Sequence, residues 1–231
     1  MFYSQHQVGG SLAGLMHGIV FKRLGHNVHI LERDSSALHS RGAGITAMES
    51  VVAFLDAYDV VKRPWSITSP NIQFLNRKAE IAKIWNIELQ MTSWSALYYR
   101  LRANFDGLQS KYCPELPTIP SESEGTSASA VGKATYDQGK NVTDVKDTDG
   151  AITVVFASTG GGGSIQADLL IAADGPSSTV RQIVQSGSQR KYVGYVAWRG
   201  TVLEKVVSEA TKKVFPGKLS YFRMSRSHIL L

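Results

Sequence analysis

Apolar and polar positions over residues 2–31 predict a strand, a helix and a second strand. The helical period runs over residues 12–24, with apolar side chains at Leu12, Leu15, Met16, Ile19, Val20 and Leu24. Gly25 follows, where a helix-ending glycine is common. Residues 2–8 and 27–31 form the extended runs on either side. The pattern indicates the opening of a βαβ unit.

Four further elements follow from the same kind of pattern. A helix is predicted over residues 46–58, with a core stripe at Met48, Val51, Val52, Leu55 and Tyr58. Residues 72–75 and 81–85 alternate as two antiparallel strands. Ser93 is a candidate N-cap for a helix over residues 94–108.

The next segments change from helical to extended patterning. Residues 117–130, rich in Ser, Glu and Pro, predict a mobile surface loop. Strands are expected at 131–136, 140–146 and 151–157, as a β meander with a tight turn at Asp149-Gly150. The glycines at 160–163 favour a flexible turn over a phosphate loop, because no Gly-Lys-Ser/Thr follows them.

The first strand is unusual for a parallel sheet. Central strands of such sheets are normally continuous apolar runs. Residues 4–7 here read Ser-Gln-His-Gln. We interpret this start as a replaced or wrongly assigned N-terminus, rather than as evidence that His6 is a site residue.

The amino-acid composition indicates a globular protein and constrains its function little. The chain has 231 residues, 43% hydrophobic and 19% charged, with a net charge of +6. Residues 1–180 carry 15 Lys and Arg against 17 Asp and Glu, whereas residues 181–231 carry 10 against 2. A basic tail without interleaved aromatics or a DNA-binding motif disfavours nucleic acid and fits an acidic segment or anionic ligand better.

The remaining bulk features suggest a reducing compartment. Cys113 is the single cysteine and has no internal disulfide partner. No secretory signal or membrane-spanning run is apparent, so we expect a cytoplasmic protein without membrane association. No His, Cys, Asp or Glu cluster has metal-ligand spacing, so we expect no metal.

The turn between the first strand and the first helix has the pattern of a dinucleotide site. It reads Gly9, Gly10, Ser11, Leu12, Ala13 and Gly14, with Ser11 in place of the second glycine of G-x-G-x-x-G. Glu32 lies 18 residues beyond Gly14, near the spacing of the acid that binds a ribose. The helix N-terminus offers N–H groups and a positive dipole end to a diphosphate. At this point a nicotinamide dehydrogenase and a flavoprotein are equally open.

A second informative stretch is residues 167–181. An apolar run, which we expect to be a buried strand, leads into Asp174-Gly175, and Ser178 is a candidate cap for a helix beginning at Thr179. By itself this is a common turn and a capped helix. Its placement about 160 residues after the glycine turn is uncommon.

Together these motifs resemble those of the FAD-dependent aromatic monooxygenases with the p-hydroxybenzoate hydroxylase fold. The supporting segments are residues 9–14, 25–33, 41–45, 168–181 and 192–200, the last resembling the dihydroxypyridine hydroxylase branch. The resemblance implies an α/β fold. It comprises a Rossmann-like FAD/NAD(P)-binding domain with a three-stranded β meander, and the start of a mixed β-sheet substrate domain.

The resemblance also implies the domain division and the cofactor contacts. The FAD-binding domain would comprise residues 1–64 and 93–185, and the partial substrate domain residues 65–92 and 186–231. Gly9 to Gly14 would hold the FAD diphosphate, Glu32 with Arg33 the adenosine ribose region, and Arg41 would lie near the flavin. Asp174, Gly175 and Arg181 would serve FAD and the nicotinamide donor.

By the same resemblance, NADH or NADPH would reduce the flavin and dioxygen would hydroxylate a hydroxylated aromatic or N-heteroaromatic ring. A homodimer of the full-length form is a further expectation. The chain would end part-way into the substrate domain, before the second flavin motif, as a fragment or faulty gene model would.

Two alternatives stay open. One is an inactive FAD- or nucleotide-binding fragment. The other is a nicotinamide dehydrogenase, although we find no convincing catalytic Tyr-Lys or His-Asp pair in the sequence. Trp198 and Arg199 are candidates for the substrate side, with core packing of Trp198 equally expected. No residue is assigned as a catalytic acid or base.

Overall fold

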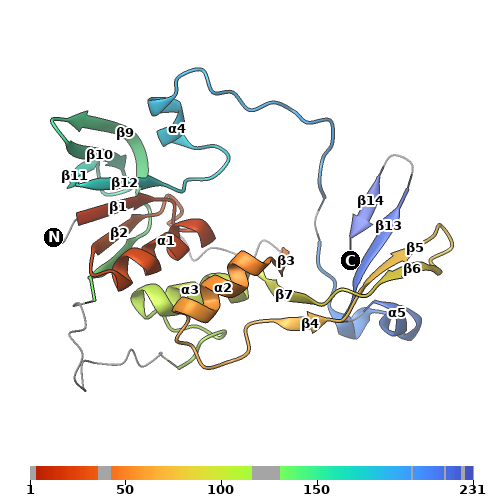
Figure 1. The fold of residues 1–231 in the computed structure, drawn as a ribbon. Helices are drawn as coiled ribbons and strands as arrows, with labels where there is room; N and C mark the ends of the chain where they lie inside the picture. The colour runs from red at the N-terminus through yellow and green to blue at the C-terminus, as the bar shows by residue number, and fades with distance from the viewer. Residues whose placement is uncertain are drawn as a thin grey trace. The chain divides into compact units, whose positions relative to one another are not determined.

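The glycine turn directly follows the first strand of the chain, which is a central strand of a four-stranded parallel sheet (Figure 1). The computed structural model describes residues 4–35, 43–115, 131–198, 200–215, 217–224 and 227–230. The sheet has the order β12-β1-β2-β8, with β1 at Ser4–Val8, β2 at Asn27–Leu31, β8 at Ala134–Asp137 and β12 at Leu169–Ala172. All three pairings are parallel. The α/β fold class and the opening βαβ unit are confirmed.

One face of this sheet carries helices α1 (Leu12–Arg23) and α3 (Trp94–Asp106). The side of α1 that is buried differs from the predicted stripe, because Gly14, Gly18 and Lys22 are buried beside Leu15 and Ile19 whereas Leu24 is exposed. Gly18 allows this close approach, since a Cβ there would lie 2.9 Å from the Phe105 ring of α3. The buried Lys22 donates to the last carbonyls of α3, which have no partner within their own helix.

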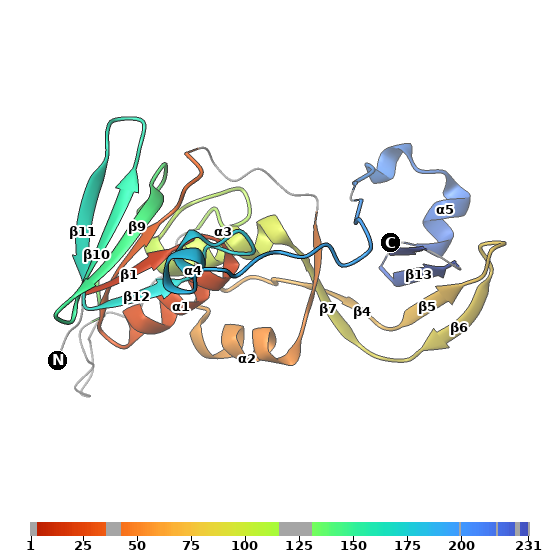
Figure 2. The ribbon, with the colours of Figure 1, turned by 90° about the horizontal axis from the view of Figure 1, so that it is seen from above.

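The other face carries a three-stranded antiparallel meander, as Figures 1 and 2 show. It consists of β9 (Asn141–Thr148), β10 (Ala151–Ala157) and β11 (Gly163–Ala167). Its apolar side chains pack with Val8, Leu31 and Val180, the last from α4 (Thr179–Val184). The prediction of a three-stranded meander is confirmed, but the segment predicted as its first strand, residues 131–136, does not belong to it. Residues 134–137 pair with β2 instead, because a short run such as Ala-Thr-Tyr-Asp does not specify its partner strand.

The polar first strand is accommodated by both layers. With its amide nitrogen toward Gly14, the orientation that satisfies both groups, Gln7 donates to the Gly14 carbonyl over 2.6 Å and accepts from the Gly18 N–H over 3.1 Å. The His6 imidazole on the opposite face makes a 2.8 Å hydrogen bond with the Gln166 carbonyl of β11. Side-chain hydrogen bonds therefore anchor β1 where apolar packing was expected.

The chain divides into two compact units. The first contains residues 1–40, 54–62 and 95–196, and holds the elements above except for the start of α3. The second contains residues 41–53, 63–94 and 197–231. The predicted assignment of the parts to cofactor and substrate stays a prediction.

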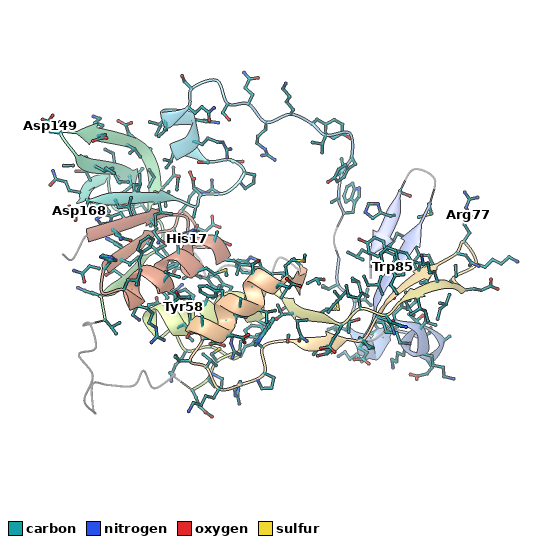
Figure 3. All side chains as sticks on the ribbon, viewed as in Figure 1. His17, Tyr58, Arg77, Trp85, Asp149 and Asp168 are labelled. Carbon is teal, nitrogen blue, oxygen red and sulfur yellow. The ribbon has the colours of Figure 1, made fainter. Side chains whose placement is uncertain are left out.

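The second unit has two small sheets. One has the order β3-β7-β4, with β3 at Gly44–Ala47, β4 at Ile67–Ser69 and β7 at Leu89–Ser93. The other has the order β14-β13-β5-β6, with β5 at Ile72–Leu75, β6 at Ile81–Trp85, β13 at Leu219–Arg223 and β14 at His228–Leu230. A short helix α5 (Glu209–Val214) and a 3-10 turn at Glu204–Val206 precede β13. The predicted antiparallel pair at 72–75 and 81–85 is confirmed, and its turn carries Arg77 (Figure 3).

Two predicted helices need correction. The helix expected over residues 46–58 is shorter, because residues 44–47 form β3 and helix α2 spans Glu49–Tyr58. Met48 precedes α2 and is exposed, so it is not part of a core stripe. The third helix, α3, ends at Asp106 rather than at 108, and Ser93 is the last residue of β7. The loop predicted at 117–130 lies outside the described residues.

Candidate functional site

Three neighbouring parallel strands end at the same edge of the first unit's sheet. Val8 of β1 is in register with Leu31 of β2 on one side and with Ala172 of β12 on the other. The glycine turn, Glu32 and Asp174 each follow directly or within two residues. The structure thus brings together the predicted residues of three separate motifs, at the strand ends where open α/β sheets bind ligands.

The glycines of the turn are required by close backbone contacts. Gly9 has a φ of +99°, and a Cβ there would lie 2.3 Å from the Ala173 carbonyl oxygen. A Cβ on Gly14 would lie 2.0 Å from the Gly9 carbonyl oxygen. The Gly9 N–H also donates to the Leu31 carbonyl over 3.0 Å. These contacts hold the turn against the ends of both neighbouring strands.

The helix that follows the turn has an N-terminus suited to an anion. Ser11 occupies the N-cap position, and its carbonyl accepts from the Leu15 N–H over 3.0 Å, but its side chain makes no cap hydrogen bond. The first turn of α1, with Leu12 and Ala13, contains no acidic residue. The positive end of the helix dipole and its first N–H groups are therefore not neutralised by a carboxylate of the helix's own first turn.

Glu32 is directed back into the glycine turn. It is 8% exposed, and its Oε2 accepts from the Gly10 N–H over 2.8 Å while Oε1 accepts from the Asp34 N–H over 2.9 Å. Each carboxylate oxygen can accept a further hydrogen bond. The neighbouring Arg33 is exposed and lies 3.9 Å from the Asp34 carboxylate, the arrangement of a weak surface ion pair. Arg41 lies outside the described residues.

The two carboxylate oxygens of Asp174 differ in their hydrogen bonding. Its Oδ2 accepts from the N–H groups of Thr179 and Val180, over 2.7 and 3.3 Å. Its Oδ1 is buried and has no hydrogen-bond partner among the described residues. A buried carboxylate oxygen normally has a donor, so this atom fits a hydroxyl group of a bound molecule.

The turn after Asp174 is formed by its own side chains. Gly175 has a φ of +78°. Ser178 accepts from the Arg181 N–H over 2.9 Å, which confirms the predicted cap of α4. The Arg181 guanidinium donates to the Pro176 carbonyl over 2.7 Å. The Arg181 side chain therefore stabilises the turn.

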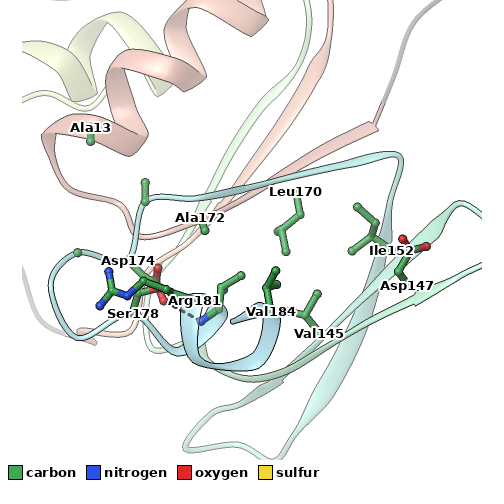
Figure 4. Close-up of a pocket in the computed structure, with 13 residues that line it drawn as sticks. Ala13, Val145, Asp147, Ile152, Leu170, Ala172, Asp174, Ser178, Arg181 and Val184 are labelled. Carbon is green, nitrogen blue, oxygen red and sulfur yellow. Dashed lines mark hydrogen bonds between the residues drawn. The ribbon is translucent and has the colours of Figure 1, made fainter. Parts of the chain in front are cut away.

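An open cavity of about 680 Å³ extends from Asp174 under α4 (Figure 4). Asp174, Ser178 and Arg181 lie at one end, and the rest is lined by Asp147 and by apolar side chains, among them Val145, Ile152, Leu170, Val180 and Val184. Strand β12 borders it at the edge of the sheet, with its residues half-buried or exposed. The prediction of a buried strand here was wrong, because the described residues provide no strand on that side of β12.

A buried polar network behind the glycine turn was not predicted. The Tyr136 hydroxyl of β8 donates to the Gly10 carbonyl over 2.9 Å and lies 3.2 Å from the Tyr98 hydroxyl of α3. Arg102 donates to that Tyr98 hydroxyl over 2.9 Å and forms a 2.7 Å ion pair with Asp106. The spacing of Arg102 and Asp106 on a predicted helix is the one sequence signal for this network.

Burial changes the proton affinities in this region. Burial raises the pKa of Tyr136, and the hydrogen bond with Tyr98 raises it further. Burial opposes the charge on Arg102, but the hydrogen bond and charge of Asp106 outweigh it and raise the pKa of the guanidinium. Both groups therefore keep their protons and act as donors at neutral pH.

A pair of histidines lies on the meander face of the sheet. The rings of His6 and His29 are 5.2 Å apart, and His29 Nε2 lies 3.0 Å from Asp137. Burial lowers the pKa of His6, as does the nearby His29, against the raising effects of the Gln166 carbonyl and Asp168. Within the described ranges, no three His, Cys, Asp or Glu side chains are placed to hold a metal ion. No helix in the same ranges is long and apolar enough to cross a membrane.

Comparison with known proteins shows what this chain resembles. A family model described as FAD binding domain-like matches residues 192–231. The 2,6-dihydroxypyridine 3-monooxygenase of Paenarthrobacter nicotinovorans is 25% identical over 228 residues, covering 96% of this chain and 49% of that protein. The chloroplastic zeaxanthin epoxidase of Arabidopsis thaliana is 26% identical over 222 residues, covering 91% of this chain and 31% of that protein.

A solved structure has the same fold. The 2,6-dihydroxypyridine-3-hydroxylase of Arthrobacter nicotinovorans superposes with a TM-score of 0.75 at 23% identity, covering 99% of this chain and 51% of that one. The chain thus spans about half the length of the first relative and under a third of the second. The predicted resemblance to FAD-dependent monooxygenases is confirmed, and the fold matches that of the solved 2,6-dihydroxypyridine-3-hydroxylase.

Proposed function

We propose that this chain binds FAD and is the FAD-binding portion of an NAD(P)H-dependent monooxygenase. The substrate class that we propose is a hydroxylated aromatic or N-heteroaromatic ring. The observation that carries the proposal is the buried Asp174 Oδ1, for which the described residues provide no partner, beside the glycine turn and the N-terminus of α1, which has no side-chain cap. A diphosphate with hydroxyl groups on both sides of it has the chemistry to satisfy these groups.

Each part of the site then has a separate task. The turn at Gly9–Gly14 and the first N–H groups of α1 would hold the diphosphate. The remaining acceptor sites on Glu32 would bind a ribose hydroxyl, and Asp174 Oδ1 would accept from another hydroxyl of the cofactor. Arg33 and Arg181 contact their own neighbours, so we assign them support of the adjoining turns.

The chemistry of the reaction would come from the cofactor. When bound, FAD supplies electron transfer from a nicotinamide donor and the activation of dioxygen. The chain binds and orients the cofactor and excludes water, and no side chain needs to act as acid or base for that. This agrees with the lack of an assigned catalytic residue.

The substrate class rests on the relatives. One is a monooxygenase of a dihydroxypyridine and another is an epoxidase of zeaxanthin. The first matches more of its own length and has the fold neighbour, so we favour the aromatic ring. NADH or NADPH as donor, a cytoplasmic location and a homodimer of a longer form belong to the same proposal.

The visible absorption spectrum of the purified chain, with and without added FAD, tests this function. Bound oxidised flavin gives absorption bands at about 375 and 450 nm, a property of the cofactor. Co-purification near one FAD per chain supports the proposal. A colourless chain that takes up no FAD overturns it.

The Asp174→Asn variant shows where FAD binds. The amide nitrogen cannot accept a hydrogen bond, so this variant should retain less FAD than the chain itself. Asp149→Asn is the matched control, because Asp149 lies at the exposed tip of the β9–β10 hairpin (Figure 3) with a φ of 52°, which Asn tolerates. Equal FAD content in all three proteins would contradict the role of Asp174.

Turnover assays distinguish an active monooxygenase from an FAD-binding portion without activity. Oxidation of NADPH or NADH that is stimulated by phenols or hydroxypyridines, with formation of a hydroxylated product, identifies a monooxygenase. FAD binding without any turnover identifies a binding portion that needs further polypeptide.

A further inference from the structure

Gly10 is held from both sides by side chains that lie far from it in the sequence. Its N–H donates to Glu32 over 2.8 Å, and its carbonyl accepts from the Tyr136 hydroxyl over 2.9 Å. The N–H of the Gly9–Gly10 peptide and the carbonyl of the Gly10–Ser11 peptide are thus both fixed by hydrogen bonds. Among the described hydrogen bonds of the glycines in this turn, Gly10 alone has two side-chain partners, whereas Gly14 has Gln7 and the Gly9 N–H donates to a backbone carbonyl.

Tyr136 also accounts for the absence of a side chain at position 10. A Cβ on Gly10 would lie 2.1 Å from the Tyr136 hydroxyl oxygen and 2.5 Å from the ring carbon that bears it. Gly10 has no left-handed φ that would itself require glycine. The tyrosine, and not a strained backbone, therefore demands glycine here.

The direction of each hydrogen bond behind Tyr136 follows from chemistry. Arg102 can only donate, and it donates to the Tyr98 hydroxyl over 2.9 Å. The Gly10 carbonyl can only accept, so Tyr136 uses its proton there. The Tyr98 proton is then directed at the Tyr136 oxygen, over 3.2 Å. Every hydrogen bond in this series donates in the direction of Gly10. Hydrogen bonds linked in this way polarise one another, so each becomes stronger.

The ring of Tyr136 is held as firmly as its hydroxyl. The guanidinium carbon of Arg102 lies 3.6 Å from the ring centroid, a close cation–π contact. Asp106 fixes the same guanidinium through three hydrogen bonds of 2.7–3.2 Å. Helix α3 thereby transmits its position to the glycine turn through Tyr136.

We infer that Tyr136 is a positioning residue for the diphosphate-binding turn, setting the orientation of the Gly10 peptide groups through its hydroxyl and ring. The inference rests on the proposed FAD function and adds a residue outside the glycine motif. It implies that the turn is rigid before any cofactor binds. Pre-ordering of a binding loop lowers the entropy cost of binding and so raises affinity.

The test measures the dissociation constants of FAD and of ADP for the full chain and for Tyr136→Phe. Phenylalanine keeps the ring over Arg102 and removes only the hydroxyl. Loss of one hydrogen bond to the turn should weaken both ligands about tenfold. ADP is included because it carries the diphosphate without the flavin, so an equal loss for both ligands locates the effect at the turn.

The control is Tyr99→Phe, which removes a hydroxyl from the neighbouring residue of α3. Tyr99 stacks on Tyr112 and has no described contact with the turn. Its affinities should match those of the unaltered chain. If Tyr136→Phe does not fold, Tyr98→Phe removes the preceding link of the chain and should weaken both ligands by about two- to threefold.

The outcomes separate the inference from the proposed function. Unchanged affinity in Tyr136→Phe, or in Tyr98→Phe where the former does not fold, overturns the role of Tyr136 while leaving FAD binding intact. A loss for FAD without a loss for ADP also overturns it, because the effect would then lie away from the diphosphate. An unaltered chain that binds neither ligand overturns the proposed function itself, and the inference with it.

Discussion

The two ends of the candidate site differ in how far the described residues complete them. At the Gly10 end, both peptide groups, the Glu32 carboxylate and the Tyr136 ring are held by neighbours from β2, β8 and α3. At the Asp174 end, one carboxylate oxygen has no partner and an open apolar cavity begins. The first end is held by contacts within the described residues, whereas the second has one carboxylate oxygen for which they provide no partner.

The difference follows from chain order. Residues 8–34 form the turn, helix and acid of the Gly10 end, and Tyr98, Arg102 and Tyr136 support them from behind. The Asp174 end lies on an edge strand followed by a helix of six residues. One half of the candidate site is therefore completed by side chains of the first unit, whereas the other half leaves an acceptor without a described partner.

The largest expected effect is on the rigid end. Gly14→Ala places a Cβ 2.0 Å from a backbone oxygen that cannot move without displacing the turn. We expect a loss of about 3 kcal/mol in the free energy of unfolding, or about 10 °C in Tm. Gly160→Ala is the control, because position 160 is open space and has no positive φ. Equal melting temperatures for the two variants would show that the turn is not rigid.

The second effect is on the open end. Asp174→Asn keeps an oxygen for the N–H groups of Thr179 and Val180 but replaces the unpartnered acceptor with a donor. We expect FAD affinity to fall about tenfold or more, while Tm of the cofactor-free chain changes little. Titration calorimetry and a thermal melt measure the two quantities. A large loss of Tm with unchanged affinity would make Asp174 a structural residue only.

The smallest expected effect is on the pH dependence of stability, through His6 on strand β1 of the sheet between the two ends. Because burial lowers the pKa of His6, the unfolded chain takes up the proton first as pH falls. The neutral ring stabilises the fold above the unfolded pKa of about 6.5, and that contribution is lost as pH falls through this value toward the folded pKa. The ionisable groups facing His6 are His29 of β2 and Asp168 before β12, with Asp137 of β8 behind His29.

Melting temperatures between pH 5 and 8 check this. The unaltered chain should lose Tm more steeply below about pH 6.5 than His6→Asn, which has no ring to titrate. His17→Asn changes an exposed histidine of α1 (Figure 3) and serves as the control. Parallel curves for the chain and His6→Asn would show that another group governs the acid limb.

Local pattern predicted most of the elements that carry the site. The helix after Gly10, the strand before Glu32 and the cap at Ser178 depend on neighbours within a few residues, and all three are confirmed. The turn at Asp149-Gly150 is confirmed for the same reason, since both residues have positive φ as a tight hairpin requires.

The errors concern pairings between distant segments. Nothing in residues 134–137 indicates a parallel pairing with β2 rather than a meander, and that pairing alone places Tyr136 against Gly10. Likewise Gln7 was interpreted as out of place, because its partners lie on a helix face that only the folded unit brings near. The roles of Tyr136 and Gln7 come from tertiary contact, which spacing does not encode.

The hydrogen-bonded attachment of β1 has a consequence for the temperature dependence of stability. Gln7 and His6 fasten this central strand by polar contacts to α1 and β11. Exposing polar groups on unfolding lowers the heat-capacity change, whereas exposing apolar groups raises it. The attachment of β1 should therefore weaken less on cooling than the apolar packing of Val154 and Val142 against the same sheet. In the cold, the unusual first strand would be among the better-held parts of this unit.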